Sequence, residues 1–286
     1  MSVALFEQQR PRLTAIAYGM LGSLADAEDV VQDAWLRWAD TDLTAVREPA
    51  AFLTTVVTRL AIDRLRSARH RRETYTGPWL PEPIVTELDA DPAEVVAEAE
   101  ALSLALLTAL ERLNPVERAV LLLRDVFDLD YAEIADVVDR SPSAVRQIAV
   151  RARDRAGDHA RTARVVDRDR DREVVEAFMV AAASGDLDRL VELLTEDVVA
   201  WGDGGGKRAA ARHPVAGADR VARFIAGITR QGLRLGGTGR LVRANGRLAF
   251  RAELDGEVYA VLGFDVEDGR ISAIRSVVNP DKLTHA

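Results

Sequence analysis

The stretch YAEIADVVDRSPSAVRQIAVRARDRA, residues 131–156, decides the fold of the N-terminal half of the chain. Apolar residues recur at three- and four-residue spacing on both sides of Asp139-Arg140-Ser141-Pro142, which predicts two helices joined by a tight turn. The residues that would pack between these helices are Ile134, Val137, Val138, Val145, Ile148 and Ala149. The second helix is basic, and its exposed face would carry Ser143, Arg146, Gln147, Arg151 and Arg153. Because guanidinium groups contact phosphates and guanine, and glutamine reads adenine, the pattern indicates a helix-turn-helix that enters the major groove of DNA.

Charge is distributed unevenly along the chain. The formal net charge of −8 argues against a nucleic-acid partner, since phosphates attract cationic proteins. Residues 59–72, however, hold about six arginines and one acid, and residues 140–172 hold about ten arginines and five acids. Between them, residues 73–100 hold roughly eight acids and no base. The local pattern therefore predicts two DNA-binding segments separated by an acidic connection.

Length and composition narrow the class of protein. A chain of 286 residues with 48% hydrophobic residues is long enough for two or three domains with cores of their own. It contains no cysteine, and its four histidines are scattered, so we predict no disulfide, no metal site and no cofactor. The sequence has no apolar run of about eighteen residues and no secretion signal at its start. We therefore expect a cytoplasmic protein with no membrane partner.

The remaining N-terminal sequence is typical of helices. Apolar spacing predicts helices over residues 6–21, 25–38, 50–69, 97–113 and 116–126. Asp26 is expected to cap the second of these helices and Pro49 to start the third. Prolines and Gly77 interrupt residues 73–93, which are predicted to form a linker. The expected divisions are a helical domain over 1–72, a linker over 73–96, a second helical domain over 97–164 and a C-terminal domain over 168–286.

The C-terminal domain has a different pattern. Residues 173–194 predict two helices divided by Ser184-Gly185-Asp186, and residues 218–231 predict another. From residue 238 onward apolar and polar residues alternate, with turn signals at Asn245-Gly246, Asp255-Gly256 and Asp268-Gly269. This order indicates an α+β domain in which helices cover one face of a curved antiparallel meander.

The first 160 residues resemble bacterial extracytoplasmic-function sigma factors. The helix-turn-helix segment resembles their region 4, and DAEDVVQDAWLRW (26–38) followed by FLTTVVTRLAIDRLRSARHRR (52–72) resembles their region 2. The resemblance implies that the chain binds core RNA polymerase and directs it to promoter DNA. The residues implied to contact polymerase are Asp29, Gln32, Asp33 and Arg37. Those implied to act at the minus-ten element are Asp63, Arg64, Arg66 and Arg69, while Arg59 replaces an asparagine common in the family.

The resemblance also assigns the other N-terminal segments. Residues 143–156 would contact the minus-thirty-five element. The acidic linker would thread the RNA-exit path of the polymerase, and its charge would keep it away from DNA.

Residues 168–284 resemble SnoaL-like domains, whose cone-shaped fold is shared with ketosteroid isomerase. Three short motifs resemble those of sigma factors that carry this domain. They are Trp79-Leu80-Pro81-Glu82-Pro83, Asp203-Gly204-Gly205-Gly206-Lys207 and Asn279-Pro280-Asp281-Lys282-Leu283. We predict that the second and third motifs fix the C-terminal domain against the linker or the helical domains, so that it regulates the sigma factor in cis.

Alternative functions remain open at this point. The triple-glycine loop is not a phosphate-binding loop, since Trp201 and Arg208 occupy positions that need a glycine and a hydroxyl residue. Asp203, Lys207 and His213 would support catalysis by an isomerase or cyclase if all three faced the cavity of the cone. For the SnoaL-like domain, a pocket that binds an unidentified small ligand without chemistry is a further alternative. For the whole chain, the other alternative is a DNA-binding repressor or activator with a ligand-sensing domain. We favour a sigma factor that is not an enzyme, because a simple repressor has no use for region 2.

Overall fold

The computed structural model describes residues 2–42, 44, 46–73, 75–88, 102–157, 168–284 and 286. The chain divides into two compact units. A helical unit contains residues 1–74 and 92–162, and a C-terminal unit contains residues 75–91 and 163–286. The first part of the predicted linker thus belongs to the C-terminal unit, although it precedes half of the helical unit in sequence.

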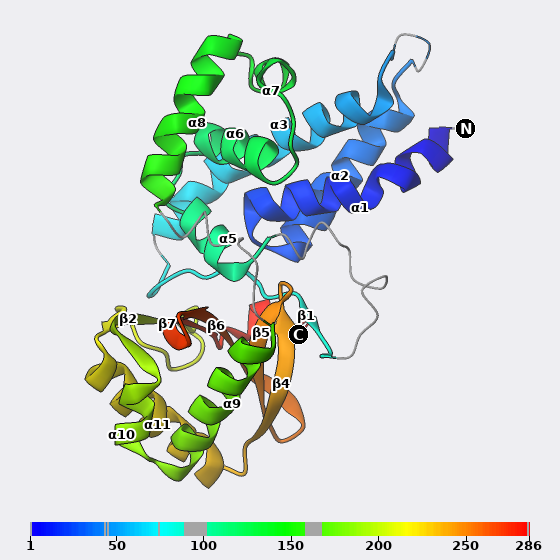
Figure 1. The fold of residues 1–286 in the computed structure, drawn as a ribbon. Helices are drawn as coiled ribbons and strands as arrows, with labels where there is room; N and C mark the ends of the chain where they lie inside the picture. Colours follow the sequence, from blue (N-terminus) through cyan, green and yellow to red (C-terminus); the bar gives the residue numbers. More distant parts are fainter. Residues whose placement is uncertain are drawn as a thin grey trace. The chain divides into compact units, whose positions relative to one another are not determined.

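The helical unit begins with three long helices (Figure 1). They are α1 (Ser2–Leu21), α2 (Leu24–Ala39) and α3 (Pro49–Glu73). The expectation that Asp26 caps α2 is wrong. The cap is Ser23, whose hydroxyl oxygen accepts a hydrogen bond from the Asp26 backbone nitrogen. Asp26 instead lies in the first turn, where its negative charge interacts favourably with the positive end of the helix dipole.

Four shorter helices complete this unit. They are α5 (Leu104–Leu110), α6 (Pro115–Asp125), α7 (Tyr131–Val138) and α8 (Pro142–Ala156). The helix predicted over 97–113 is described only from residue 102, and in that part the helix is confined to α5. Asp130 caps α7 in a capping box with Glu133, and Ser141 caps α8 just before Pro142. These local caps explain why the helix-turn-helix was predictable almost to the residue.

The segments on either side of the linker pack against each other within the helical unit. Arg118 of α6 is 3% exposed, and its Nη1 donates a 2.7 Å hydrogen bond to the carbonyl oxygen of Met20 near the end of α1. The contact between α1 and α6 is close, since a Cβ atom added to Gly19 would lie 2.8 Å from a methyl carbon of Leu122. A second arginine, Arg59 of α3, donates to the last turn of α7. The two predicted sigma regions therefore share one packed unit.

The C-terminal unit is a seven-stranded sheet covered on one face by three helices (Figure 1). The helices are α9 (Arg168–Ser184), α10 (Leu187–Glu192) and α11 (Ala218–Arg234). The strands are β1 (Val85–Thr86), β2 (Leu194–Asp203), β3 (Val215–Ala216), β4 (Thr238–Ala244), β5 (Arg247–Leu254), β6 (Glu257–Glu267) and β7 (Arg270–Val277). Their order across the sheet is β1-β4-β5-β6-β7-β2-β3.

The predicted meander is confirmed for β4 to β7, which pair antiparallel in sequence order. Its turns fall at the three predicted dipeptides, where Asn245, Asp255 and Asp268 all adopt positive φ. Two features differ from the expectation. Strand β2 pairs in parallel with β7, and β1 of the linker adds an antiparallel edge beside β4.

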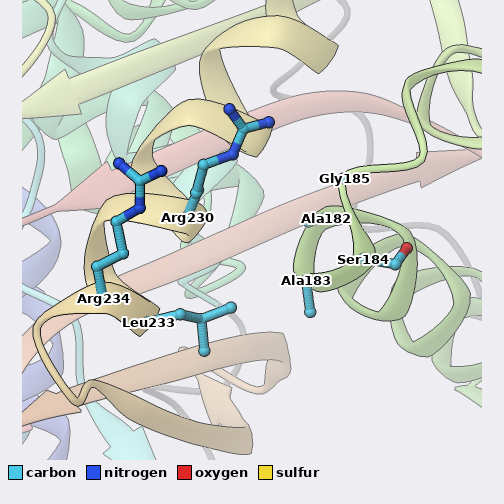
Figure 2. Close-up of a pocket in the computed structure, with 7 residues that line it drawn as sticks. All are labelled: Ala182, Ala183, Ser184, Gly185, Arg230, Leu233 and Arg234. Carbon is cyan, nitrogen blue, oxygen red and sulfur yellow. The ribbon is translucent and has the colours of Figure 1, made fainter.

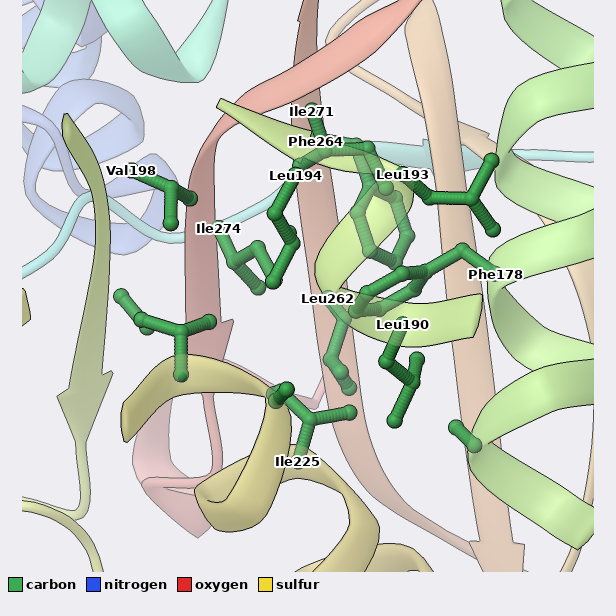
Figure 3. Close-up of a cluster of buried hydrophobic side chains, with 14 of the residues drawn as sticks. Phe178, Leu190, Leu193, Leu194, Val198, Ile225, Leu262, Phe264, Ile271 and Ile274 are labelled. Atoms are coloured by element: carbon green, nitrogen blue, oxygen red, sulfur yellow. The ribbon is translucent and has the colours of Figure 1, made fainter. Parts of the chain in front are cut away.

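Apolar side chains fill the space between the three helices and the sheet (Figure 3). Phe178 of α9 meets Phe264 of β6 edge to face, with 6.0 Å between the ring centroids. Around them pack Leu190, Leu193, Leu194, Val198, Ile225, Leu262, Ile271 and Ile274. The interior of the cone is thus the hydrophobic core of this unit.

Candidate functional sites

Asp203, at the end of β2, is the centre of a buried polar cluster and is 0% exposed. Its Oδ1 accepts hydrogen bonds from the Tyr75 hydroxyl (2.5 Å) and the Gly205 backbone nitrogen (3.1 Å). Its Oδ2 accepts from the Leu80 backbone nitrogen (2.8 Å) and the Lys282 ammonium (2.7 Å). Four donors therefore satisfy a carboxylate that would otherwise be costly to bury.

Lys282 joins the three motifs to one another. Its Nζ donates to the Leu80 carbonyl oxygen at 2.5 Å as well as to Asp203, and it lies 3.8 Å from the centroid of the Trp79 ring. Asn279 donates from Nδ2 to the Tyr75 hydroxyl oxygen at 2.9 Å. We call these six residues, Tyr75, Trp79, Leu80, Asp203, Asn279 and Lys282, the linker clasp. Both C-terminal motifs thus contact the linker within the C-terminal unit.

The triple glycine allows a close backbone approach at the clasp. Gly205 has a φ of +59°, and a Cβ atom there would overlap the side chain of Asn279. A Cβ atom on Gly204 would overlap the backbone carbonyl of Arg208. The loop is therefore a structural turn that brings residue 279 against residue 205.

The linker continues along the sheet after the clasp. Leu80, Pro81, Glu82 and Pro83 are all buried. Ile84 and Asn245 exchange hydrogen bonds, with the Ile84 nitrogen donating to Asn245 Oδ1 and the Asn245 nitrogen donating to the Ile84 carbonyl oxygen. The two residues of β1 then pair with β4. The linker is held by an edge-strand addition as well as by the clasp.

The environment of Tyr75 predicts a test at alkaline pH. Burial and the hydrogen bond to Asp203 raise the pKa of the Tyr75 hydroxyl above its ordinary value of 10.0. The folded state then holds this proton more tightly than the unfolded state, so the contribution is fully present below pH 10.0 and is lost as the pH rises above it. We expect the wild-type urea midpoint to fall more steeply than that of Tyr75→Phe between about pH 9 and 11. Parallel midpoints would contradict the assigned hydrogen bond.

The three candidate catalytic residues do not share a cavity. Asp203 is buried in the clasp, whereas Lys207 and His213 are exposed. Lys207 forms an ion pair with Asp281 at 2.6 Å, and side chains of the core occupy the cone interior. The arrangement required for acid–base catalysis by this trio is absent from the described C-terminal residues.

A pocket does lie between the C-terminal ends of α9 and α11, with a volume of about 330 Å³ (Figure 2). Arg230 and Arg234 lie one turn apart on α11 beside Leu233, and the Arg230 guanidinium approaches Gly185 at the end of α9. Its other lining residues are Ala182, Ala183, Ser184 and Gly185. The pocket contains none of the three motifs predicted to regulate the chain.

The face of α2 predicted to bind polymerase is exposed. Gln32, Asp33 and Arg37 lie on it with an apolar residue, Leu36, which is 55% exposed and was not predicted. Asp29 lies at its edge, where its carboxylate accepts a 2.7 Å hydrogen bond from Arg64 of α3. Sequence could have indicated Leu36, since it follows Asp33 at helical spacing on the same face.

The predicted minus-ten residues on α3 fall into different environments. Arg64 also pairs with Asp26 at 2.6 Å, and these hydrogen bonds raise the pKa of its guanidinium. Arg66 is exposed and pairs with Asp63 at 3.3 Å. The side chain of Arg69 lies outside the described residues. Arg64 is therefore tied to α2, which leaves Arg66 as the accessible cation among the members of this set whose side chains the structure describes.

The face of α8 predicted to bind DNA carries arginines in two kinds of environment. Arg146 stacks over the ring of Tyr131 with 5.6 Å to the centroid, and Gln147 and Arg151 are exposed. Arg153 instead donates two hydrogen bonds to Asp125 of α6, at 2.9 and 2.5 Å, which raise its pKa. Of the predicted DNA-binding residues on α8, Arg153 is thus held in an internal ion pair.

Comparison with known families agrees with this architecture. Residues 5–71 match the family model for sigma-70 region 2, and residues 103–155 match that for sigma-70 region 4. The chain is 46% identical to the ECF RNA polymerase sigma factor SigJ of Mycobacterium tuberculosis, over 99% of this chain and 94% of that protein. It belongs to the extracytoplasmic-function family of RNA polymerase sigma factors. The matches to both regions support the predicted sigma-factor function over the alternative of a ligand-responsive repressor.

The similarity extends through the C-terminal unit. The crystal structure of M. tuberculosis SigJ superposes with a TM-score of 0.80 at 41% identity, covering 99% of both chains. A probable ECF sigma factor, SigI of the same organism, is 33% identical over 98% of this chain and 94% of its own length. The fold is thus two sigma helical regions and a C-terminal helix-and-sheet domain. None of the helices among the described residues has the length and hydropathy needed to span a bilayer.

Proposed function

We propose that this sigma factor binds core polymerase through the exposed face of α2, reads the two promoter elements with α3 and α8, and is regulated in cis by its SnoaL-like domain. Its place of action would be the cytoplasm, where polymerase and promoter DNA are found. The observation that carries the regulatory part is the linker clasp, because the linker connects the two sigma regions in sequence. A linker fixed along the C-terminal sheet restricts the path available between them.

The clasp supports regulation rather than catalysis as the role of the SnoaL-like domain. Asp203 and the glycine loop are committed to holding Tyr75 and Leu80, and core side chains fill the interior that would receive a substrate. The domain then acts as a built-in partner of the linker.

Asp33 provides the sharpest test of polymerase binding. Asp29 pairs with Arg64, so reversing its charge would also disrupt the helical unit, whereas Asp33 is exposed on the same face. We expect Asp33→Lys to weaken binding of core polymerase by about threefold to tenfold, with a marked change in salt dependence. Asp188→Lys, an exposed position on α10, serves as the control. Equal affinities for Asp33→Lys and wild type would refute the α2 assignment.

Promoter recognition by α8 is tested with Arg146→Ala and Gln147→Ala in reconstituted transcription and footprinting. Loss of a phosphate-contacting arginine should weaken binding to every promoter and lower the salt slope by about one, while loss of Gln147 should relax preference at one base pair. Arg223→Ala, on the exposed face of α11, is the control. Unchanged footprints over the minus-thirty-five element in both variants would remove α8 as its reader.

A further inference from the structure

A line of side chains crosses the exposed face of α8. Ser143, Gln147, Val150 and Asp154 are separated by four, three and four residues, which places them on one side of the helix. The opposite side is buried and consists of Val145, Ala149, Ala152 and Ala156. Val150 is 56% exposed, although valine is the kind of residue that usually packs inside.

The orientation of this line is set by ion pairs behind it. Arg153 binds Asp125, and Arg155 binds Glu117, the residue that also completes the capping box of α6. Both contacts hold the C-terminal half of α8 against α6 and draw two cations away from the outward face. The outward face therefore presents Gln147 and Val150 side by side, with Arg146 and Arg151 flanking them.

We propose that Val150 is a specificity-determining residue that contacts the 5-methyl group of a thymine in the minus-thirty-five element, next to an adenine read by Gln147. This inference rests on the proposed entry of α8 into the major groove. The thymine methyl is the apolar group that base edges present in that groove, so an exposed valine has a matching target. Its β-branched side chain is stiff and loses little conformational freedom on contact.

Uracil in place of thymine tests the contact, since it removes the methyl group and keeps the hydrogen-bonding edge. Core polymerase carrying the full chain is bound to promoter fragments in which each thymine of the minus-thirty-five element is replaced singly. We expect one replacement to weaken wild-type binding by about threefold to fivefold, the loss typical of one buried methyl group. Val150→Ala should show the same loss on the unmodified promoter and no further response to that uracil.

Two controls make the result specific. Val180→Ala removes another exposed valine, from α9, and should keep the wild-type response to uracil. Alanine also favours helix more than valine does, so α8 should remain folded in Val150→Ala, as circular dichroism will check. Wild-type binding that ignores every uracil, or a Val150→Ala variant that keeps the response, overturns the role of Val150 alone. Minus-thirty-five footprints unaffected by Arg146→Ala and Gln147→Ala overturn both this role and the proposed reading by α8.

Discussion

Replacing Asp203 with alanine is expected to release the linker and to destabilise the C-terminal unit by about 3–5 kcal/mol, the loss typical of breaking a buried ion pair. The substitution removes the carboxylate that accepts a hydrogen bond from Lys282, which is 9% exposed, and with it the acceptor of the Tyr75 hydroxyl and the Leu80 nitrogen. Urea unfolding followed by tryptophan fluorescence measures the stability. Proteolysis rates at residues 75–88 measure linker release, and promoter-directed transcription measures the consequence for activity.

Lys207→Ala is the matched control for this prediction. Lys207 belongs to the same loop, but its ion pair with Asp281 is 57% and 61% exposed at the two side chains. Exposed pairs of this kind contribute about 0–1 kcal/mol, so this variant should unfold and be cleaved almost as the wild type is. If Asp203→Ala retained the wild-type stability and the wild-type cleavage rate, the clasp would not hold the linker.

The sequence identified the three motifs of the clasp but not how they pair. Asp203 and Lys207 are the charged residues nearest the glycines, and their motif as a whole was predicted to contact the linker or the helical domains. The structure instead pairs Asp203 with Lys282, seventy-nine residues later, and gives Lys207 to Asp281. Hydrogen bonds between such distant positions depend on how β2 and β7 align, and local patterns carry no information about that register.

The helix-turn-helix, unlike the clasp, follows from local sequence signals. Asp130, Glu133, Ser141 and Pro142 cap helices through neighbours within three residues, so the bounds of α7 and α8 follow from local chemistry. The turns of the β4–β7 meander were predictable for the same reason. The sequence did not predict the parallel pairing of β2 with β7 or the edge strand β1. Alternation of apolar residues within one strand does not determine which strand it pairs with.

Sequence patterns also did not predict residues that form hydrogen bonds between distant helices. Arg59 stood out only as a departure from the family's asparagine. In the structure its Nε donates to the Val137 carbonyl oxygen at 2.9 Å and its Nη2 to the Asp136 carbonyl oxygen at 2.7 Å. These carbonyls end α7, where they lack partners within the helix and where the helix dipole favours a cation. An arginine of α3 thus caps the C-terminal end of α7, the first helix of the helix-turn-helix.

Arg59→Ala is therefore expected to loosen region 4 from region 2. We propose that promoter binding requires these regions to part, because each reads a separate DNA element. Loss of two hydrogen bonds from a charged donor would favour the parted state by about 2 kcal/mol, roughly a thirtyfold shift in the equilibrium. The fraction of molecules in the parted state, which can bind the promoter, would rise. Promoter-directed transcription at limiting sigma factor should therefore increase.

The chain contains no cysteine, so single cysteines at Ser67 in α3 and Asp154 in α8 allow a pair of fluorophores to report the distance between the regions. Arg59→Ala should broaden and lengthen the distance distribution. Arg59→Lys keeps the charge but not the forked geometry of the guanidinium. Its distance distribution should fall between those of Arg59→Ala and the wild type. Arg10→Ala, which removes a partly exposed arginine paired with Glu7 on α1, should leave the distance distribution unchanged. If Arg59 instead serves as a DNA contact, Arg59→Ala will keep the wild-type distances and lose promoter affinity, and the closing role assigned to this residue will be wrong.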